Sequence, residues 1–437
     1  MKLAYRVFLK VTRVLFPTLL RHLVRKRRYR QICDCLVLLI RVNTVLWHRV
    51  NGVARSGRIR VGGRGTKTLL CFDRVIFDKD LREIAGRTTL DIVLFHNEHY
   101  TFLANAFLSE QVRHQTYYFG TDDDSKVTLF EFIDDIILRL QEKLGFNALL
   151  NSNIIYYQDH EWSKVARKRG IPFLTLCKEV PATEKNERLW VKDWKDFPYY
   201  GDGIAVYSNW ARDTLSNGCN VGTHARYEIT GCPRTDAIYD VFQEEENSGV
   251  KRYVVMFDFI EYRKERLWET SMTQFLRVAN EVASSQPDLR FIIKTKYRED
   301  IAGIREFIGT LGITDDNVVI THDMELTEIA RNARLICGFR TTAIIKLMCS
   351  DVEVIVVNWA EALDDPDDTL ITENFSESCV HAGSEMHFYD AIQEALEGES
   401  RPGGARRLQR DELIKKNLHI IDGRRSLAFE EFVGLVI

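Results

Sequence analysis

The chain has 437 residues, of which 45% are hydrophobic and 11% aromatic, which is enough for two or three globular domains. Its formal net charge of −3 is unevenly distributed, because residues 1–64 hold 16 Lys and Arg and one acidic residue, whereas the remaining residues carry −18. A basic head on an acidic body argues against a nucleic-acid-binding enzyme and fits a head that meets an anionic surface.

Nine cysteines are scattered along the chain, and only Cys33 and Cys35 form a close pair. No second pair lies at the spacing of metal ligands, and no signal peptide is recognisable. We therefore expect reduced thiols in a cytosolic protein without structural zinc.

Residues 1–64 begin with a basic amphipathic helix, which we expect to kink or end at Pro17. A later apolar run, Cys35–Ile40, is ended by Arg41 well short of the ~20 residues that a membrane-spanning helix needs. Two hypotheses remain open for this head. It is either a helical hairpin on the anionic cytoplasmic face of a membrane or a helical extension packed on the next domain. A linker rich in Gly and Arg, Asn51–Gly65, follows.

Residues 65–242 alternate between short apolar runs and helical patterns, which predicts a first α/β domain. Three acidic residues follow predicted strands: Glu98, Asp159, which comes after the predicted strand Asn153–Tyr157, and Glu179. Ligands of open parallel sheets collect at the carboxyl ends of the strands. Each acid is therefore a candidate general base or substrate contact.

A metal site is not predicted in this domain. His96, Glu98 and His99 lie within four residues, but they lack the i, i+4 spacing of a zinc-binding helix, and no third ligand is evident. We therefore prefer a base or a substrate contact for this segment.

Glu179 ranks first among the candidate acids, followed by Asp159 and Glu98. It comes directly after Lys178 and before a polar loop rich in Trp and Tyr, Pro181–Gly203, and loops of that length are usually functional or disordered. The alternative is that Glu179 is a structural acid in a salt bridge.

Residues 243–437 are predicted to form a second α/β domain, after a polar and acidic boundary at Gln243–Gly249. One predicted strand delivers Lys294 and Lys296, and lysines at the end of a strand suit an anionic ligand. The alternative is that both lysines are solvated beside neighbouring acids.

The segment Asn317–Trp359 contains three short apolar runs that alternate with two helical patterns, which predicts a βαβαβ unit and a parallel sheet. The second run ends at Gly338, and Arg340, Thr341 and Thr342 follow. A glycine permits close approach, threonines cap a helix, and free N–H groups with a fixed cation suit a phosphate. The alternative is that the threonines only cap the helix and the arginine is solvated.

The order of these motifs resembles that in GT-B glycosyltransferases, especially the bacterial-type capsule and lipopolysaccharide transferases. It is more distantly similar to the CDP-glycerol glycerophosphotransferases of teichoic-acid synthesis. The resemblance spans roughly residues 66–435. Its motifs are Gly170-Ile171-Pro172, Cys177-Lys178-Glu179, Thr230-Gly231-Cys232-Pro233-Arg234-x-Asp236, Lys294-Thr295-Lys296, Phe339-Arg340-Thr341-Thr342 and Asp422-Gly423. No His-Pro follows Lys294, and Arg340 stands where relatives usually carry a neutral residue.

The resemblance implies a metal-independent glycosyltransferase with two Rossmann-like domains that face each other across a cleft. A nucleotide sugar would bind the C-terminal domain and the acceptor the N-terminal one, without a further cofactor. The residues that would hold the donor are Lys294, Lys296, Arg340, Thr341 and Thr342. Glu179, Asp159 or Glu98 would supply the base, and Lys178 and Arg234 would lie at the cleft.

The expected partners are a nucleotide sugar, a glycan or lipid-linked glycan acceptor, and an anionic membrane surface that contacts residues 1–64, but no nucleic acid. This would make the chain a cytoplasmic protein that is peripheral at the membrane. Two alternatives stay open: a transferase of polyol phosphate, and a catalytically inactive scaffold of the same fold.

Overall fold

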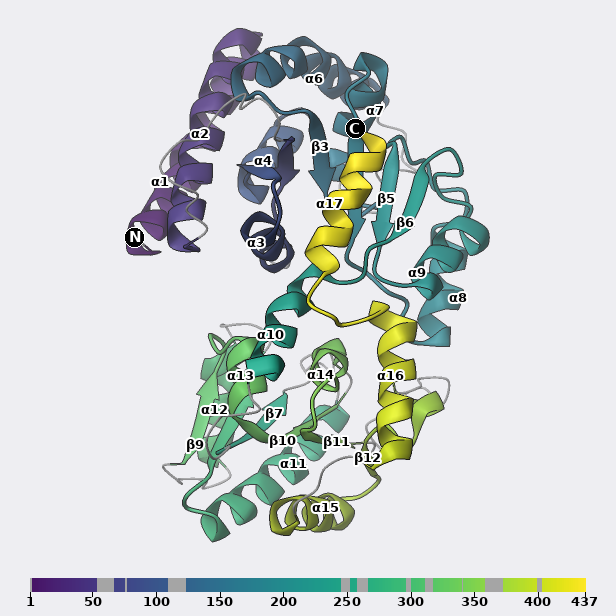
Figure 1. Ribbon diagram of the computed structural model, residues 1–437. Helices are drawn as coiled ribbons and strands as arrows, with labels where there is room; N and C mark the ends of the chain where they lie inside the picture. Colours follow the sequence, from purple (N-terminus) through teal and green to yellow (C-terminus); the bar gives the residue numbers. More distant parts are fainter. Residues whose placement is uncertain are drawn as a thin grey trace. The chain divides into compact units, whose positions relative to one another are not determined.

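The computed structural model describes two compact units, each built on its own parallel sheet (Figure 1). The first unit comprises Met1–Val180, Val191–Arg234 and Arg424–Ile437, and the second comprises Pro181–Trp190 and Thr235–Gly423. The described residues are 2–52, 67–74, 77–108, 123–244, 252–257, 266–295, 300–310, 317–339, 341–357, 372–398 and 403–437.

The sheet of the first unit has six parallel strands in the order β2-β1-β3-β4-β5-β6. The strands are β1 (Thr68–Phe72), β2 (Asp91–Phe95), β3 (Ala148–Asn151), β4 (Phe173–Cys177), β5 (Gly203–Val206) and β6 (Arg226–Ile229). Most are short runs buried along their whole length, as expected when helices cover both faces. The chain runs outward from β1 to β2 and then returns to β3 on the other side of β1. The strand order therefore reverses between β1 and β3.

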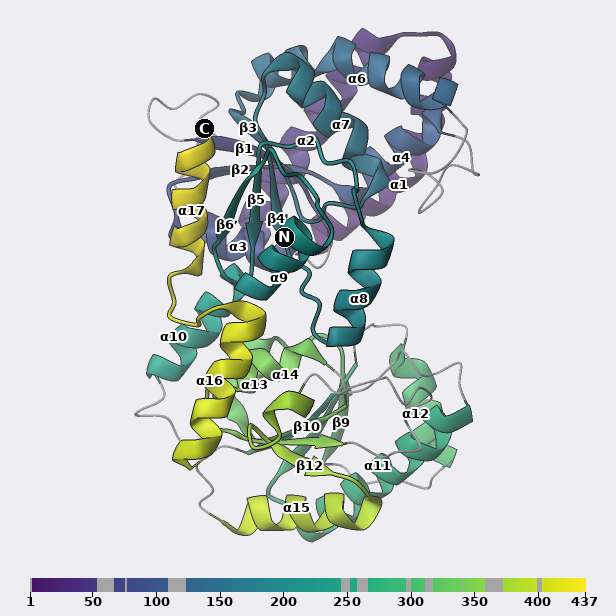
Figure 2. The same ribbon diagram turned by 90° about the vertical axis from the view of Figure 1, so that its right-hand side faces the viewer.

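Helices cover both faces of the first sheet. On one face α17 packs against α3 and β5, and on the other α6 and α4 both pack against α7. Figure 2 shows α17 and α7 on opposite sides of the strands. The final helix of the chain thus belongs to the first domain. These helices are α3 (Asp78–Arg87), α4 (Asn97–Phe107), α6 (Asp123–Leu144), α7 (Tyr157–Arg169) and α17 (Arg425–Val436), and shorter turns are α9 (Asn209–Asp213), η2 (Thr214–Gly218) and η3 (Pro233–Thr235).

The basic head is a helical hairpin packed on the first domain. Its helices are α1 (Lys2–Arg25), which continues through Pro17 instead of ending there, and α2 (Tyr29–Val50). Helix α2 contacts β2 and α6, and α1 contacts α2 and α4. Within the described residues, α2 alone is long and apolar enough to span a membrane, but its apolar side lies in the domain core. The packed extension is therefore the arrangement observed for α2.

One predicted strand, Asn153–Tyr157, is wrong. The strand β3 ends at Asn151, whose side-chain amide donates to the carbonyl oxygen of Asn153 at 2.7 Å, and the Asn153 side chain accepts from the N–H of Ile155 at 3.0 Å. These local bonds turn the chain away from the sheet. As a result Asp159 lies in the first turn of α7 and not at the end of a strand.

The sheet of the second unit has six parallel strands in the order β12-β11-β10-β7-β8-β9. The strands are β7 (Tyr253–Phe257), β8 (Arg290–Lys294), β9 (Val318–Thr321), β10 (Ala333–Gly338), β11 (Glu353–Val357) and β12 (Val380–Ala382). This is the doubly wound dinucleotide-binding order, with its reversal between β7 and β10. The predicted alternation of strands and helices from β9 to β11 is confirmed. However, β9 lies at the edge beside β8 and not beside β10.

The helices of the second unit form two groups. One group contains α11 and α15, which pack together, with α12 beside β9. The other contains α10, α13, α14 and α16, which contact one another in sequence. Their bounds are α10 (Asp236–Glu244), α11 (Arg266–Ser285), α12 (Asp300–Thr310), α13 (Leu326–Asn332), α14 (Thr342–Leu347), α15 (Glu385–Glu397) and α16 (Gly404–Leu418). The short helix η7 (Glu373–Phe375) contacts α16, and the residues of α8 (Glu184–Asp193) are divided between the two units. The predicted class, two Rossmann-like α/β domains, is confirmed.

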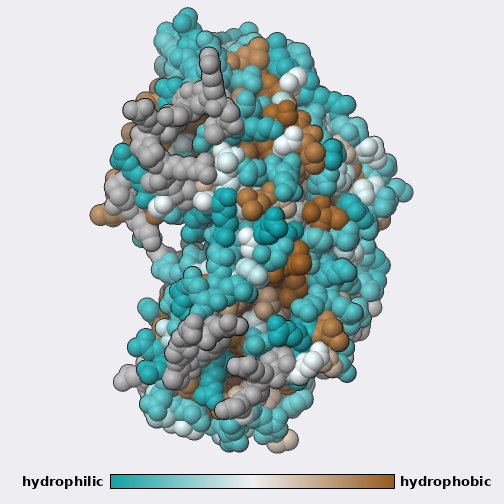
Figure 3. All heavy atoms as spheres, viewed as in Figure 1, coloured by the Kyte–Doolittle hydropathy of each residue, from teal (hydrophilic) through white to brown (hydrophobic). Residues whose placement is uncertain are grey.

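On the face shown in Figure 3, hydrophilic residues cover most of the described surface, and hydrophobic residues form separate patches. This is the usual distribution for a folded protein in water.

The docking of α17 on β5 gives a test of the fold. A Cβ atom on Gly203 would lie 2.7 Å from Cζ of Phe432 and 3.0 Å from Cγ2 of Val436, both in α17. We expect Gly203→Ala to lower the melting temperature, because overpacking of this kind costs about 1–3 kcal/mol. Gly86→Ala is the control, because open space surrounds Gly86 in α3 and the change should be neutral or stabilising by about 0.5–1 kcal/mol. Equal melting temperatures for Gly203→Ala and the wild type would contradict the packing.

Candidate functional site

The first candidate site lies where the strand order of the first sheet reverses. Asp73 and Arg74 follow β1, and Ser152 and Asn153 follow the neighbouring strand β3. Ligands of open α/β sheets bind outside the carboxyl ends of strands at such a reversal. This placement brings two residues to the site that the sequence analysis missed, Asp73 and Arg74. The rule that an acid directly after a strand is a candidate site residue would have found Asp73, because Asp73 directly follows the apolar run Thr68–Phe72.

Arg74 is a fixed cation at this edge. Its Nη2 donates to Oε1 of Gln158 at 3.0 Å, and its guanidinium carbon lies 3.6 Å from the centre of the Tyr156 ring and 5.6 Å from that of Tyr100. Stacking on aromatic rings holds a guanidinium while leaving donors available. Across the described ranges, no carboxylate forms an ion pair with Arg74.

Asp73 is a buried carboxyl group beside Arg74. Burial raises its pKa to about 8, and the charge of Asp78 adds to the shift, whereas the backbone N–H and the charge of Arg74 oppose it. Among the described residues, Oδ1 of Asp73 has no hydrogen-bond partner, and the hydroxyl of Tyr100 donates to the backbone carbonyl of Asp73 at 3.1 Å. Asp73 is therefore largely protonated at neutral pH.

Asp159 is the predicted acid on which the Arg74 charge acts. It is only 2% exposed, and burial raises its pKa to about 6, whereas the Arg74 charge and a hydrogen bond from Asn151 lower it. Nδ2 of Asn151 donates to Oδ2 of Asp159 at 3.2 Å, and Oδ1 of Asn151 accepts from the Thr175 hydroxyl at 2.6 Å. That hydroxyl lies 2.9 Å from the Tyr199 hydroxyl. These buried hydrogen bonds hold the side chain of Asp159 in place through its Oδ2 atom. At neutral pH Asp159 is ionised, whereas Asp73 is largely protonated.

Glu98 and the neighbouring histidines, His96 and His99, have separate roles. Glu98 lies in the first turn of α4 and forms an ion pair with Arg13 of α1 at 3.5 Å. Nδ1 of His96 caps α4 by accepting from the Glu98 N–H at 3.3 Å, and burial lowers the His96 pKa to about 4. A neutral ring that accepts at Nδ1 carries its proton on Nε2, so His96 can only donate from that atom.

His99 lies inside the domain core and does not join the edge. Its ring centre is 5.5 Å from that of Phe16 in α1, and burial lowers its pKa to about 3. The described residues contain no group of three or more His, Cys, Asp and Glu side chains that could hold a metal ion.

Glu179 and Lys178 pair with each other after β4. The Lys178 ammonium contacts Oε1 of Glu179, and the Lys178 side chain is 5% exposed, against 38% for Glu179. The Lys178 N–H donates to the carbonyl oxygen of Ser152 at 3.3 Å, which joins the ends of β4 and β3. The structure thus places the first-ranked acid in a salt bridge near the same edge, with its carboxylate turned toward solvent.

Arg234 is bound within the first unit. Its Nε lies 2.9 Å from Oδ1 of Asp80, a second guanidinium nitrogen contacts Oδ2, and the Tyr207 hydroxyl donates to the same carboxylate at 2.9 Å. Asp80 is completely buried, so Arg234 neutralises a buried charge. A place for Arg234 at the cleft between the domains stays a prediction.

The second candidate site lies at the strand reversal of the second sheet, between β7 and β10. Gly338 ends β10 opposite Phe257, and a Cβ there would lie 3.1 Å from Cβ of Phe257 and 3.1 Å from Cδ1 of Ile344. The glycine is therefore needed for this close packing. Thr341 caps α14, with its hydroxyl accepting from the Ala343 N–H at 3.3 Å, and Thr342 is the exposed first residue of that helix.

Lys294 ends β8, the neighbour of β7. Its ammonium donates to the carbonyl oxygens of His322 at 2.6 Å and Thr295 at 3.2 Å. Three of the five predicted donor residues thus lie along one edge of one sheet, at β8 and β10. The other two, Lys296 and Arg340, lie outside the described residues.

Comparisons with known proteins support the fold. No family model and no curated protein matches the sequence. Among solved structures, a putative UDP-N-acetylglucosamine 2-epimerase from Listeria monocytogenes aligns with a TM-score of 0.52 at 11% identity, covering 84% of this chain and 95% of that one. A second UDP-N-acetylglucosamine 2-epimerase gives 0.51 at 12% identity, with 84% and 95% covered, and a UDP co-structure of S. aureus MnaA gives 0.50 at 11%, with 85% and 98% covered. At these identities the likeness shows a shared GT-B-type fold of two Rossmann-like domains.

The protonated Asp73 predicts how stability changes with pH. Its folded pKa of about 8 lies above the unfolded value, so its contribution to stability is complete below about pH 4 and is lost as the pH rises toward 8. Asp73→Asn imitates the protonated group. We expect it to melt like the wild type near pH 4.5 but about 3 °C or more higher at pH 8.5.

Asp213→Asn is the control for this experiment, because the Asp213 side chain is half exposed. Its melting-temperature difference from the wild type should not grow with pH. A constant difference for Asp73→Asn across the same range would show that Asp73 is ionised in the folded protein.

Proposed function

We propose that this protein is a glycosyltransferase that moves a sugar from a nucleotide-activated donor to a growing surface glycan or glycolipid. The observation that carries the proposal is the placement of Gly338, Thr341 and Lys294 along the edge where the second sheet reverses its strand order. Nucleotides bind doubly wound sheets at this position. The UDP-related names of the fold neighbours support a nucleotide sugar as the donor.

The donor diphosphate would lie across β10 and β8. Gly338 lets Phe257 and Ile344 pack closely at the end of β10, the Thr341 and Thr342 hydroxyls offer donors, and Lys294 supplies a positive charge. In the proposal Lys296 and Arg340 add two further cations, so that protein groups stabilise the leaving nucleotide. No cofactor other than the donor itself is part of the proposal.

The acceptor would bind the first domain, at the edge between β1 and β3. A general base works best with a pKa near the working pH, and the raised pKa of Asp159 meets this requirement. The salt bridge with Lys178 makes Glu179 the weaker candidate. Arg74 offers guanidinium donors to an anionic group of the acceptor, such as a phosphate or a sugar carboxylate. An acceptor carried on a lipid would place the enzyme at the cytoplasmic face of a membrane, as a peripheral protein.

Substitution of the two acids tests the assignment of the base. We expect Asp159→Asn to lower the rate of sugar transfer by about 10²–10⁴-fold, because loss of a general base has an effect of that size. Asn keeps the shape of the side chain and an oxygen that can accept from Asn151. The measurement is nucleotide release from a panel of nucleotide sugars in the presence of glycan acceptors.

Glu179→Gln is the matched control and should retain most of the activity. If Glu179→Gln abolishes transfer and Asp159→Asn does not, the base is Glu179 and the proposed role of Asp159 is wrong. The rate of the wild type should also rise between pH 5 and 7, as Asp159 loses its proton.

The same panel separates the alternatives. Cytidine monophosphate release from CDP-glycerol would indicate a transferase of polyol phosphate. Conversion of a UDP-sugar without any acceptor would indicate an epimerase, the activity named for the fold neighbours. A failure of every nucleotide to bind would indicate a scaffold without transferase activity.

A further inference from the structure

Helix α1 carries an apolar stripe that no described part of the protein covers. The stripe consists of aliphatic side chains that are between 44% and 75% exposed. Its members are Leu3, Val7, Val11, Val14, Leu15 and Leu19. Single exposed hydrophobic residues are common on protein surfaces, but a continuous stripe along one helix marks an interaction site.

The stripe faces away from the domain. The buried side chains of α1 are Thr12, Phe16, Leu20 and Leu23, which belong to the side that packs on α2 and α4. Nine residues are two and a half helical turns, so a residue lies on the opposite side of the helix from the one nine positions later. Val7, Val11 and Val14 are thus placed opposite Phe16, Leu20 and Leu23.

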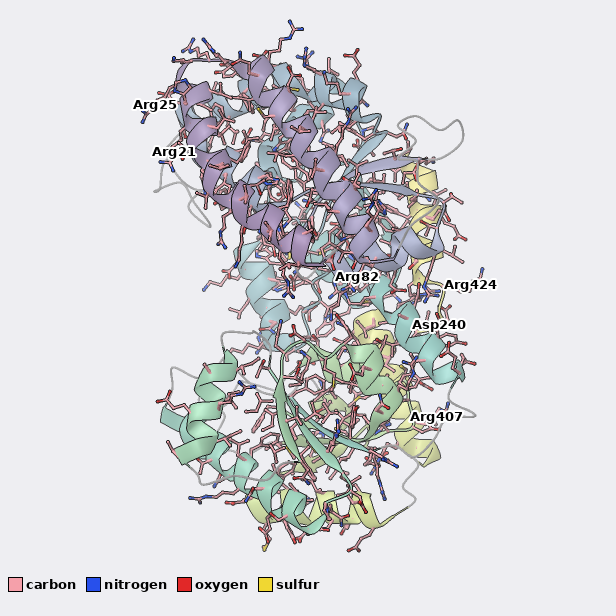
Figure 4. All side chains as sticks on the ribbon, turned by 90° about the vertical axis from the view of Figure 1, so that its left-hand side faces the viewer. Arg21, Arg25, Arg82, Asp240, Arg407 and Arg424 are labelled. Atoms are coloured by element: carbon pink, nitrogen blue, oxygen red, sulfur yellow. The ribbon has the colours of Figure 1, made fainter. Side chains whose placement is uncertain are left out.

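A row of cations flanks the stripe. Arg6, Lys10, Arg13, Arg21 and Arg25 are all exposed, and α1 contains no acidic residue. Lys10 lies three positions after Val7 and four before Val14, which makes it their neighbour on the helix surface. Within the described ranges, Arg13 pairs with Glu98 at 3.5 Å, and the other four form no ion pair. Figure 4 shows Arg21 and Arg25 projecting outward from α1.

The cations continue past the end of the helix. Lys26, Arg27 and Arg28 are exposed in the turn between α1 and α2. Helix α1 therefore combines three surfaces along its 24 residues: one packed, one aliphatic and one basic. An aliphatic surface beside a row of Lys and Arg is the pattern of a helix that lies in the interface of a membrane.

We propose that this outward surface of α1 docks on an anionic lipid bilayer, with the helix parallel to the membrane plane. The aliphatic stripe enters the boundary between headgroups and acyl chains, and the cations contact the lipid phosphates. The charge favours this partner, because α1 carries cations and no acidic residue, and the surface of an anionic bilayer supplies many negative groups to such a row. The inference rests on the proposed peripheral location and is independent of sugar transfer.

Vesicle binding of the full chain tests the proposal without any nucleotide. We expect cosedimentation with vesicles of phosphatidylglycerol and phosphatidylcholine, and binding at least tenfold weaker to phosphatidylcholine alone. The double variant Val7→Glu with Val14→Glu should bind the anionic vesicles at least tenfold more weakly. Arg6→Gln with Lys10→Gln should lose about tenfold or more, because each basic residue at the surface contributes about fivefold.

Met386→Glu and Leu408→Glu are the controls, because these side chains are 75% and 68% exposed in α15 and α16 of the other unit. Both should bind vesicles like the wild type, and all variants should keep their melting temperature. Equal binding by the α1 variants and the wild type would overturn the proposal. So would light scattering that shows an oligomer of the wild type and a monomer of the Val7→Glu, Val14→Glu variant, because the stripe would then join two copies of the chain. Sugar transfer to a soluble acceptor is measured separately, so failure of the docking proposal does not affect the proposed activity.

Discussion

The parallel pairing of the strands is the constraint on which both candidate sites depend. In each sheet the six strands end at the same edge, and the strand order reverses once, between β1 and β3 and between β7 and β10. Because the central strands are buried on both faces, polar side chains gather at this edge and beneath it. The same geometry thus produces an acidic and cationic cluster in the first domain and a glycine with hydroxyls and a lysine in the second.

Asp73 and Asp159 in the first cluster are both buried, but they differ in protonation at neutral pH. Asp73 and Asp159 are both carboxyl groups with raised pKa values, but of the two only Asp159 receives a hydrogen bond from a described side chain, that of Asn151. Arg74 stabilises the ionised form of each, and stacking on Tyr156 keeps it in place. Neighbouring carboxyl groups whose environments separate their pKa values are typical of sites that transfer protons. The proposed base follows from this difference in ionisation.

The sequence predicted those parts of the structure that depend on local pattern. The two α/β domains, the run of elements from β9 to β11 and the amphipathic character of α1 all follow from apolar periodicity. The strand at Asn153–Tyr157 was predicted wrongly, because side-chain bonds of Asn151 and Asn153 compete with the sheet. The pairing of Arg234 with Asp80 joins residues 154 positions apart, and the separation of β9 from β10 depends on strands formed earlier in the chain. Such long-range contacts leave no local signal. The roles of the predicted site residues stay predictions.

The central claim is that a nucleotide binds at the edge between β7 and β10. Hydrogen–deuterium exchange of the full chain, with and without UDP, CDP, GDP or ADP at saturating concentration, tests it most directly. We expect one nucleotide to slow exchange in peptides covering residues 333–347 and Arg290–Lys294, at the ends of β10 and β8. Slower exchange confined to the ends of β1 and β3, or no change with any nucleotide, would contradict it.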